Sequence, residues 1–117
     1  MVIGIEIKEK FSLVVAEGDL NEDDLEKISN AVDVLLDKGY RHVVLDMSGV
    51  PSMSANGLGT LVNNGGQIRF KRGDLKIVGL NSRLMHLFRT MGLEGTFDLY
   101  PTITEMMEKT GRLPAIA

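Results

Sequence analysis

Few side chains in this sequence are suited to covalent chemistry. There are no cysteines, so thiolate catalysis, disulfides and cysteine-based zinc sites are excluded. The two histidines, His42 and His86, have no serine or carboxylate at a spacing that suggests a catalytic triad. No His, Asp and Glu residues recur at the spacing of metal ligands. We therefore expect structural roles for both histidines, no enzymatic activity, and neither a metal nor a cofactor.

A pair of glycines is the other motif with a link to ligand chemistry. Gly57 and Gly59 follow an apolar run, at the place where a dinucleotide-binding turn opens its helix. The third glycine of Gly-x-Gly-x-x-Gly is missing because position 62 is Val, and the Lys-Ser/Thr pair of a P-loop is missing too. Glycines at a helix start can equally serve tight packing on a sheet, and we prefer that interpretation to nucleotide binding.

Composition and charge limit the partners. The chain has 117 residues, of which 44% are hydrophobic, and this size favours one globular domain. The net charge of −3 argues against nucleic-acid binding, and the only basic cluster (residues 69–72) is interpreted as a solvated helix end. No apolar run approaches the roughly 18 residues of a membrane span, and the N-terminus lacks the apolar core of a signal peptide. We expect a cytoplasmic protein without membrane insertion.

Hydrophobic periodicity predicts the elements of the N-terminal half. Alternating apolar residues indicate strands over 2–8 and 11–16, joined as a hairpin. Asn21 is a good N-cap, and apolar residues then recur at helical spacing up to Gly39, a typical left-handed helix end. These features predict a hairpin followed by one long amphipathic helix.

A second group of elements surrounds the glycine pair. The run 42–47 is apolar and rich in β-branched residues, which predicts a strand covered on both faces. A polar loop over 48–56 leads into a second helix from Gly57, in which residues 63–66 (NNGG) are poor helix formers. Met53 is hard to bury within such a loop, so it is a candidate contact residue, with core or lid packing as the alternative.

The C-terminal half continues the alternation of strand and helix. A strand is predicted over 75–80, a third helix from the N-cap Asn81 to Gly92, and a short strand over 96–100. The third helix carries its apolar stripe at positions Leu84, Leu87, Phe88 and Met91. Thr102 opens a capping box for a last helix.

The predicted order of elements is β-β-α-β-α-β-α-β-α. Strands that alternate with helices after a hairpin imply an α/β fold with a mixed, mostly parallel sheet of about five strands and four helices. We expect a single domain over 1–111 and a C-terminal tail over 112–117.

The central stretch resembles a known family. Residues 43–62 (VVLDMSGVPSMSANGLGTLV) are similar to the pattern V-x-L-D-L-S-G-V-x-x-[IM]-D-S-S-G-L-G-x-L-V of STAS-domain anti-sigma factor antagonists. Residues 18–21 resemble the G-E-L-D of that family, and residues 81–84, 91–93 and 97–100 resemble its third helix and last strand. The resemblance covers nearly the whole chain in the same order, and it implies a STAS-like fold.

The resemblance also implies a function in bacterial transcription regulation by partner switching. In that family a dephosphorylated antagonist binds an anti-sigma factor, which is also a serine kinase, and so frees the sigma factor. Phosphorylation of one serine at the start of the second helix breaks the complex, and a phosphatase restores it. A phosphate adds roughly −1.5 to −2 charges, which brings repulsion and desolvation into a packed contact.

This sequence departs from the family pattern at the switch itself. Asn56 stands at the phosphorylated serine, Ala55 at the preceding serine and Ser54 at the aspartate, while Asn21 replaces the acidic residue of G-E-L-D. Asn56 has no hydroxyl group and cannot be phosphorylated, so Ser54 or Ser52 would have to take over any such regulation.

The resemblance assigns a protein-binding face to the turn before the second helix. Asp46 is expected to support the loop. The expected partner-binding residues are Asn21, Met53, Ser54, Ala55, Asn56, Gly57 and Leu58.

Several functions stay open at this point. The first is an antagonist-like module that binds an anti-sigma factor or serine-kinase-like protein, with its usual phosphosite lost. The second is a STAS subunit of another assembly, such as a lipid-transport ATPase complex or a larger signalling complex. A nucleotide hydrolase and an unrelated scaffolding role are further alternatives.

Overall fold

The alternating and continuous apolar runs form one mixed β-sheet. The computed structural model describes residues 2–8, 11–63, 74–95 and 97–109. The five strands lie in the order in which they occur along the chain: β1 (Val2–Ile7), β2 (Ser12–Glu17), β3 (His42–Gly49), β4 (Asp74–Val78) and β5 (Asp98–Tyr100). β1 pairs with β2 antiparallel, and every later pair is parallel. The predicted hairpin and the predicted mixed, mostly parallel sheet are confirmed.

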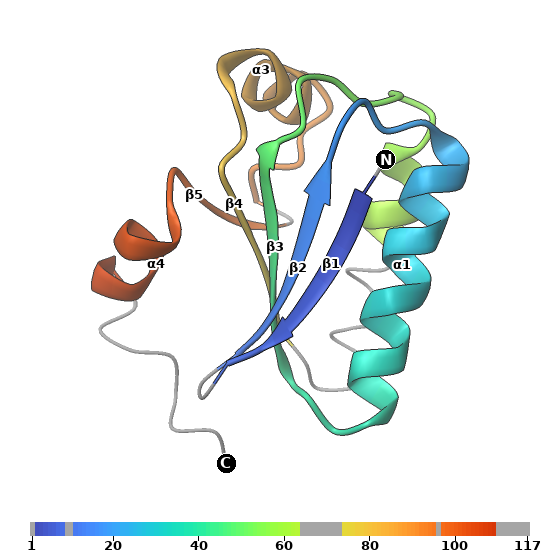
Figure 1. Cartoon of the computed structure of the whole chain (residues 1–117). Coiled ribbons are helices and arrows are strands. Elements are labelled where there is room, and N and C mark those ends of the chain that lie inside the picture. The colour runs from blue at the N-terminus through green and yellow to red at the C-terminus, as the bar shows by residue number, and fades with distance from the viewer. Residues whose placement is uncertain (1, 9–10, 64–73, 96, 110–117) are drawn as a thin grey trace.

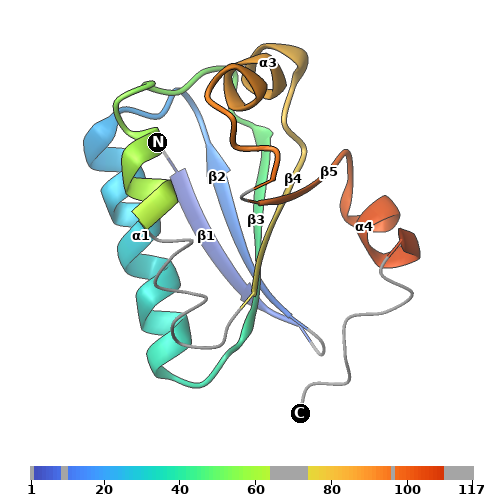
Figure 2. The same ribbon diagram turned by 180° about the vertical axis from the view of Figure 1, so that it is seen from behind.

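Helices cover both faces of this sheet. They are α1 (Glu22–Asp37), a helix that begins at residue 58 and is described to residue 63, α3 (Ser82–Thr90) and α4 (Ile103–Lys109). α1 and the helix at 58–63 lie side by side against one face, and α4 lies on the opposite face (Figures 1 and 2). α3 sits beyond the edge at which the parallel strands end (Figure 1). The predicted order of strands and helices is confirmed.

α1 begins and ends where its sequence predicts. The Asn21 side chain accepts a hydrogen bond from the Asp24 amide at 2.9 Å, and the Asp24 carboxylate accepts one from the Asn21 amide at 3.0 Å. This reciprocal capping box satisfies two of the amides that the first turn leaves free. The helix ends at Asp37 with Lys38 as its C-cap residue, and Gly39 follows with a φ of +91°, the left-handed conformation that glycine adopts at low cost.

The hydrophobic core has two parts, one on each face of the sheet. Under α1 it joins the apolar stripe of that helix to β2, β3, β4 and α3, and under α4 it is a smaller cluster around Met106. Val43, Val44 and Leu45 are consecutive and all buried, because β3 lies in the middle of the sheet with helices on both sides. The prediction that this strand is covered on both faces is confirmed.

Some predicted boundaries shift. The strand expected over 75–80 runs over Asp74–Val78, and of the strand expected over 96–100 the structure shows Asp98–Tyr100. Met91, expected on the apolar stripe of the third helix, is 44% exposed. The helix ends at Thr90 and Met91 is its C-cap residue, so Met91 no longer follows helical spacing.

A buried lysine links the last two strands of the sheet. Lys76 on β4 forms ion pairs with Asp74 and with Asp98 on β5, the latter with an Nζ–Oδ2 distance of 3.2 Å. Burial tends to lower the pKa of the Lys76 ammonium group, but the hydrogen bonds and charges of Asp74 and Asp98 outweigh it and raise that pKa above its ordinary value. Lys76 therefore stays charged at neutral pH and links two neighbouring strands.

Several predictions fall outside the described residues. They concern the tight connection at 9–10, the basic cluster at 69–72, residues 64–66 of the glycine-rich stretch and the tail at 112–117.

Candidate functional site

Two loops leave the same edge of the sheet and pair with each other. One follows β2 (residues 18–21) and the other follows β3 (residues 50–57). The Leu20 amide donates to the Ser52 carbonyl at 3.0 Å, and the Ser54 amide donates to the Leu20 carbonyl at 2.8 Å. Leu20 and Met53 thus form a parallel bridge that continues the pairing of β2 with β3 beyond the strands themselves. The loop before the second helix therefore has a fixed backbone.

Side-chain hydroxyls add to this pairing. Ser52 Oγ donates to Asp19 Oδ1 at 2.8 Å, which joins the two loops a second time. Ser54 Oγ lies 3.4 Å from the Gly57 amide, at the start of the second helix. Both serines are half-buried. These two hydroxyls hold local structure in the unmodified protein.

Asn81 fixes the loop from the opposite side. Its side-chain oxygen caps α3 by accepting from the Leu84 amide at 2.8 Å, as the sequence predicts. Its side-chain NH₂ group also donates to the Pro51 carbonyl at 3.0 Å and to the Val50 carbonyl at 3.4 Å. The sequence gives no sign of this second role, because the two contacts join residues about thirty positions apart.

The predicted loop support by Asp46 fits the geometry. Asp46 Oδ1 accepts from the Ser48 amide at 2.9 Å and from Ser48 Oγ at 2.7 Å, which turns the chain at the end of β3. Gly79 follows the neighbouring strand with φ of +82°, and a Cβ there would lie 2.8 Å from the Ser48 backbone nitrogen. Gly79 therefore permits the close approach of these two strand ends.

Two of the seven expected partner-binding residues lie inside the fold. Leu58 is 0% exposed and belongs to the core, and Gly57 is buried against Leu25 of α1. The prediction that Gly57 and Leu58 contact a partner is therefore corrected. Leu58 packs in the hydrophobic core, and Gly57 is buried against α1 beneath the turn.

The other five residues form what we call the docking surface. Its members are Asn21, Met53, Ser54, Ala55 and Asn56. Asn21, Ala55 and Asn56 are exposed, while Met53 and Ser54 are half-buried. Met53 packs partly against the core, so both of its proposed roles, packing and contact, are compatible with its position. Residues 21 and 53–56 are far apart in the sequence, and the parallel pairing of β2 with β3 brings them together.

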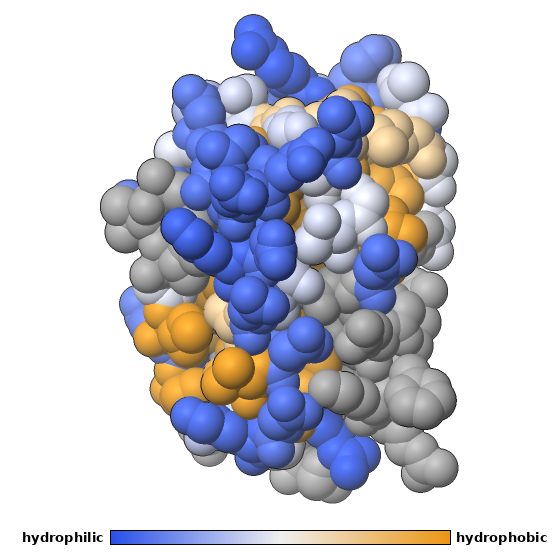
Figure 3. Space-filling model, turned by 90° about the vertical axis from the view of Figure 1, so that its right-hand side faces the viewer, coloured by the Kyte–Doolittle hydropathy of each residue, from blue (hydrophilic) through white to orange (hydrophobic). Residues whose placement is uncertain are grey.

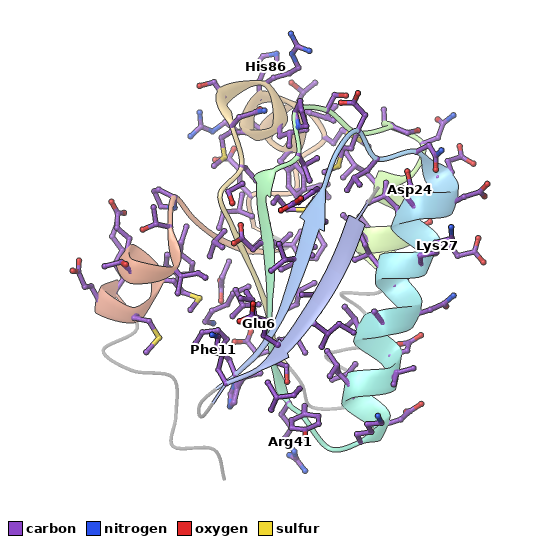
Figure 4. All side chains as sticks on the ribbon, viewed as in Figure 1. Glu6, Phe11, Asp24, Lys27, Arg41 and His86 are labelled. Atoms are coloured by element: carbon purple, nitrogen blue, oxygen red, sulfur yellow. The ribbon has the colours of Figure 1, made fainter. Side chains whose placement is uncertain are left out.

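Charge divides the surroundings of the docking surface into two parts. Residues 47–63 contain no charged side chain at all. The loop and first turn beside them carry Asp19, Glu22, Asp23 and Asp24 and no basic residue. The surface therefore has a neutral centre with an acidic border on the side of α1, where Asp24 lies at the helix start (Figure 4).

The other candidate residues are scattered. His86 points outward from α3 (Figure 4), and His42 is half-buried on β3. Within the described part of the chain, no three His, Cys, Asp or Glu residues come together as a metal site would require. Nor is any helix in those residues long and apolar enough to cross a bilayer. A hollow of about 310 Å³ opens between α3 and β5, away from the docking surface.

Comparison with known proteins identifies the fold and the family. The family profile described as the STAS domain matches residues 3–106. The chain belongs to the STAS domain family. The anti-sigma-B factor antagonist of Listeria monocytogenes is 30% identical to it over 110 residues, covering 91% of this chain and 96% of the Listeria protein.

Solved structures agree with this assignment. The crystal structure of a candidate anti-sigma factor antagonist from Thermotoga maritima superimposes with a TM-score of 0.83 at 26% identity, covering 94% of this chain and 95% of the other. The unphosphorylated anti-sigma factor antagonist SpoIIAA gives a TM-score of 0.70 at 12% identity over 94% and 98% of the two chains, which shows the shared fold. This chain is thus a STAS domain of the anti-sigma factor antagonist type, as the sequence resemblance implies.

Proposed function

We propose that this STAS domain is a non-enzymatic binding module that docks on an anti-sigma factor with serine-kinase activity. One observation supports this most: Ala55 and Asn56 are exposed on a turn, and the residues just before it are hydrogen-bonded to Leu20 and to Asn81. A rigid, exposed and uncharged turn loses little conformational entropy on binding. It is also the position that the resemblance assigns to the phosphorylated serine.

Asn56 gives this module the character of an unmodified antagonist. Its amide is neutral and has no hydroxyl to receive a phosphate. Among the described residues, its side chain forms no hydrogen bond within the chain. We propose that the module binds its partner constitutively, or that Ser54 replaces the lost site. Ser54 is the better of the two serines, because a phosphate on Ser52 would face the Asp19 carboxylate.

Charge suggests what the partner surface is like. The acidic border favours a partner with basic residues at the edge of its contact area, and such charges mainly accelerate association. The neutral centre favours contacts without charge, because a charge buried there would lose its hydration. The association rate should therefore fall as ionic strength rises.

A direct binding measurement tests the proposal. The probe is a candidate anti-sigma factor, a serine kinase of the histidine-kinase-like ATPase fold from the same organism, with affinity followed by biolayer interferometry. Asn56→Asp should weaken binding at least tenfold, because the new carboxylate must be desolvated at the centre of the contact. The matched control is Asn30→Asp, the same change at an exposed position in the middle of α1. Equal affinity for Asn56→Asp and the unchanged protein would contradict the proposal.

Intact mass after incubation with the kinase and ATP tests the regulation separately. The unchanged chain should gain no phosphate at Asn56, and Asn56→Ser should gain one. A phosphate on the unchanged chain that Ser54→Ala removes would assign the replacement site to Ser54. Failure of Asn56→Ser to accept a phosphate would count against the antagonist interpretation.

The missing hydroxyl at position 56 also favours a second candidate, a STAS subunit of another assembly that needs no phosphorylation switch. Transporter genes beside this gene, in place of a serine kinase, would support it.

A further inference from the structure

A second, smaller hollow opens where β3 and β4 end, and we call it the Asp46 hollow. Its volume is about 160 Å³, and it is lined by the ends of these two strands and by residues 101–103. Asp46 lies in register with Val15 on β2 and with Val78 on β4. Both valines belong to the core cluster under α4, so Asp46 is on that face of the sheet with apolar side chains on either side. The hollow therefore combines apolar walls with one carboxylate.

Only one oxygen of the Asp46 carboxylate is used by the fold. Oδ1 accepts from the Ser48 amide at 2.9 Å and from Ser48 Oγ at 2.7 Å. Within the part of the chain that the structure describes, Oδ2 has no hydrogen bond, and no basic side chain lines the hollow. Asp46 is half-buried, so water screens its charge less than that of an exposed carboxylate. Oδ2 is thus available to a cation from outside the chain.

The walls of the Asp46 hollow continue directly into the docking loop. A Cβ at Gly79 would lie 2.8 Å from the Ser48 backbone nitrogen, so the two walls touch each other. Ser48 leads into the loop that begins at Val50. Gly79 leads to Asn81, whose side chain donates to the Val50 and Pro51 carbonyls. A protein that covers the docking surface therefore has the mouth of the hollow at the edge of its contact area.

We propose that the Asp46 hollow receives the guanidinium group of an arginine side chain from the partner protein. This inference rests on the proposed function, because it adds a second contact to the same complex. Engineered protein cavities of about 150 Å³ hold a benzene molecule, so the hollow has room for a planar guanidinium group. The group pairs with Asp46 Oδ2, and its methylene stem packs against Pro101 and Ile103. The hydroxyl oxygens of Ser48 and Thr102 are further acceptors, which suits the fork of N–H donors on arginine better than the ammonium group of lysine.

The two sides of the docking surface thus offer different contacts to a partner. Towards α1 the border is acidic, and Figure 3 shows hydrophilic side chains over most of the exposed side of that helix. Those charges face water, so they mainly accelerate association and are screened by salt. The pair between Asp46 and an arginine is partly removed from water, so its loss should mainly accelerate dissociation.

Titration of the isotope-labelled chain with propylguanidinium chloride, followed by NMR, tests the hollow without any partner. The expected result is saturable shifts of the amides at 46–48 and 79, which sodium chloride at equal ionic strength does not produce. Asp46→Asn keeps an oxygen that accepts from Ser48 but loses the charge, so it should abolish these shifts. Absent or non-saturable shifts in the unchanged chain, or the same shifts in Asp46→Asn, would overturn the proposal. Equal shifts with propylammonium would overturn the assignment to arginine.

Affinity for the candidate anti-sigma factor kinase tests the contact in the complex. Asp46→Asn should weaken binding at least about tenfold, mainly through faster dissociation. Glu108→Gln is the matched control, because it removes a carboxylate at an exposed position of α4 outside the hollow and should change the affinity little. If the kinase binds the unchanged chain and Asp46→Asn equally well, this inference is overturned while the proposed function stands. If the kinase does not bind the unchanged chain, the proposed function fails, and the titration decides whether the hollow takes a guanidinium group.

Discussion

The contact between Gly57 and Leu25 allows a quantitative test of what holds the docking surface in place. A Cβ at position 57 would lie 2.1 Å from Leu25 Cδ1 and 3.3 Å from its Cγ. Carbon atoms normally approach to about 3.5–4.0 Å. Leu25 is fully buried, so any movement of its side chain must be accommodated within the core.

Gly57→Ala should therefore destabilise the protein. Overpacking of a tight core costs about 1–3 kcal/mol. Against this cost, alanine restricts the unfolded chain more than glycine does, and at a compatible backbone this stabilises the folded protein by about 0.4–1 kcal/mol. The expected net loss in the free energy of unfolding is about 1–2 kcal/mol, which corresponds to a melting temperature lower by about 4–8 °C.

The neighbouring glycine supplies the control. Gly59 is exposed within the described part of the second helix, and a Cβ there would meet no atom within 4 Å. Gly59→Ala should stabilise the protein by about 0.5–1 kcal/mol, because glycine is costly inside a helix. Urea unfolding followed by circular dichroism separates the two variants, whose free energies should differ by about 2 kcal/mol.

A double-mutant cycle assigns the effect to the named contact. With Leu25→Ala in place, Gly57→Ala should cost nothing further, because the clashing atoms are gone. If Gly57→Ala is as stable as the unchanged protein, or if its cost is the same in both backgrounds, the packing argument is refuted.

Three further predictions concern the loop and the sheet. Asn81→Asp should keep the cap of α3 and most of the stability, yet it should speed amide exchange over residues 50–53. Asn81→Ala also removes the cap, so its free energy of unfolding should fall by about 1 kcal/mol more. Equal exchange in both variants and in the unchanged protein would contradict the loop contact. Ser52→Ala should lose the bond to Asp19 and lower the free energy of unfolding by about 0.5–1.5 kcal/mol in urea titrations, and Asp19→Asn should have little added effect in that background. The pKa of Lys76 is raised on folding, so its stabilising contribution is present below its unfolded pKa of about 10.4 and is lost as the pH rises through the folded value. Lys76→Met should therefore remove this loss of stability at alkaline pH. If the variant shows the same slope of stability against pH as the unchanged protein, the ion pairs do not contribute as described.

Local signals predicted most of the fold. Asn21 and Gly39 mark the ends of α1, and the buried run at 43–45 marks the central strand. These features depend on residues within one or two turns of each other, so periodicity and capping reveal them. Met91 shows the limit, because one turn of helix decides whether an apolar residue is buried or exposed.

The candidate site depends on contacts that are distant in sequence. The pairing of Leu20 with Met53 follows from the register of β2 and β3, which no local pattern determines. The burial of Leu58 follows in the same way from the approach of α1 to the second helix. The family resemblance predicts the site as a region, and only the packing separates the exposed Asn56 from the buried residues that follow it.

Hydrogen exchange of the chain, with and without a candidate anti-sigma factor kinase from the same organism, tests most directly whether the exposed turn is where a partner binds. Binding should slow exchange at residues 50–57 and 18–24 and leave α4 (Ile103–Lys109) unchanged. Slower exchange at α4 with no change at 50–57 would contradict it.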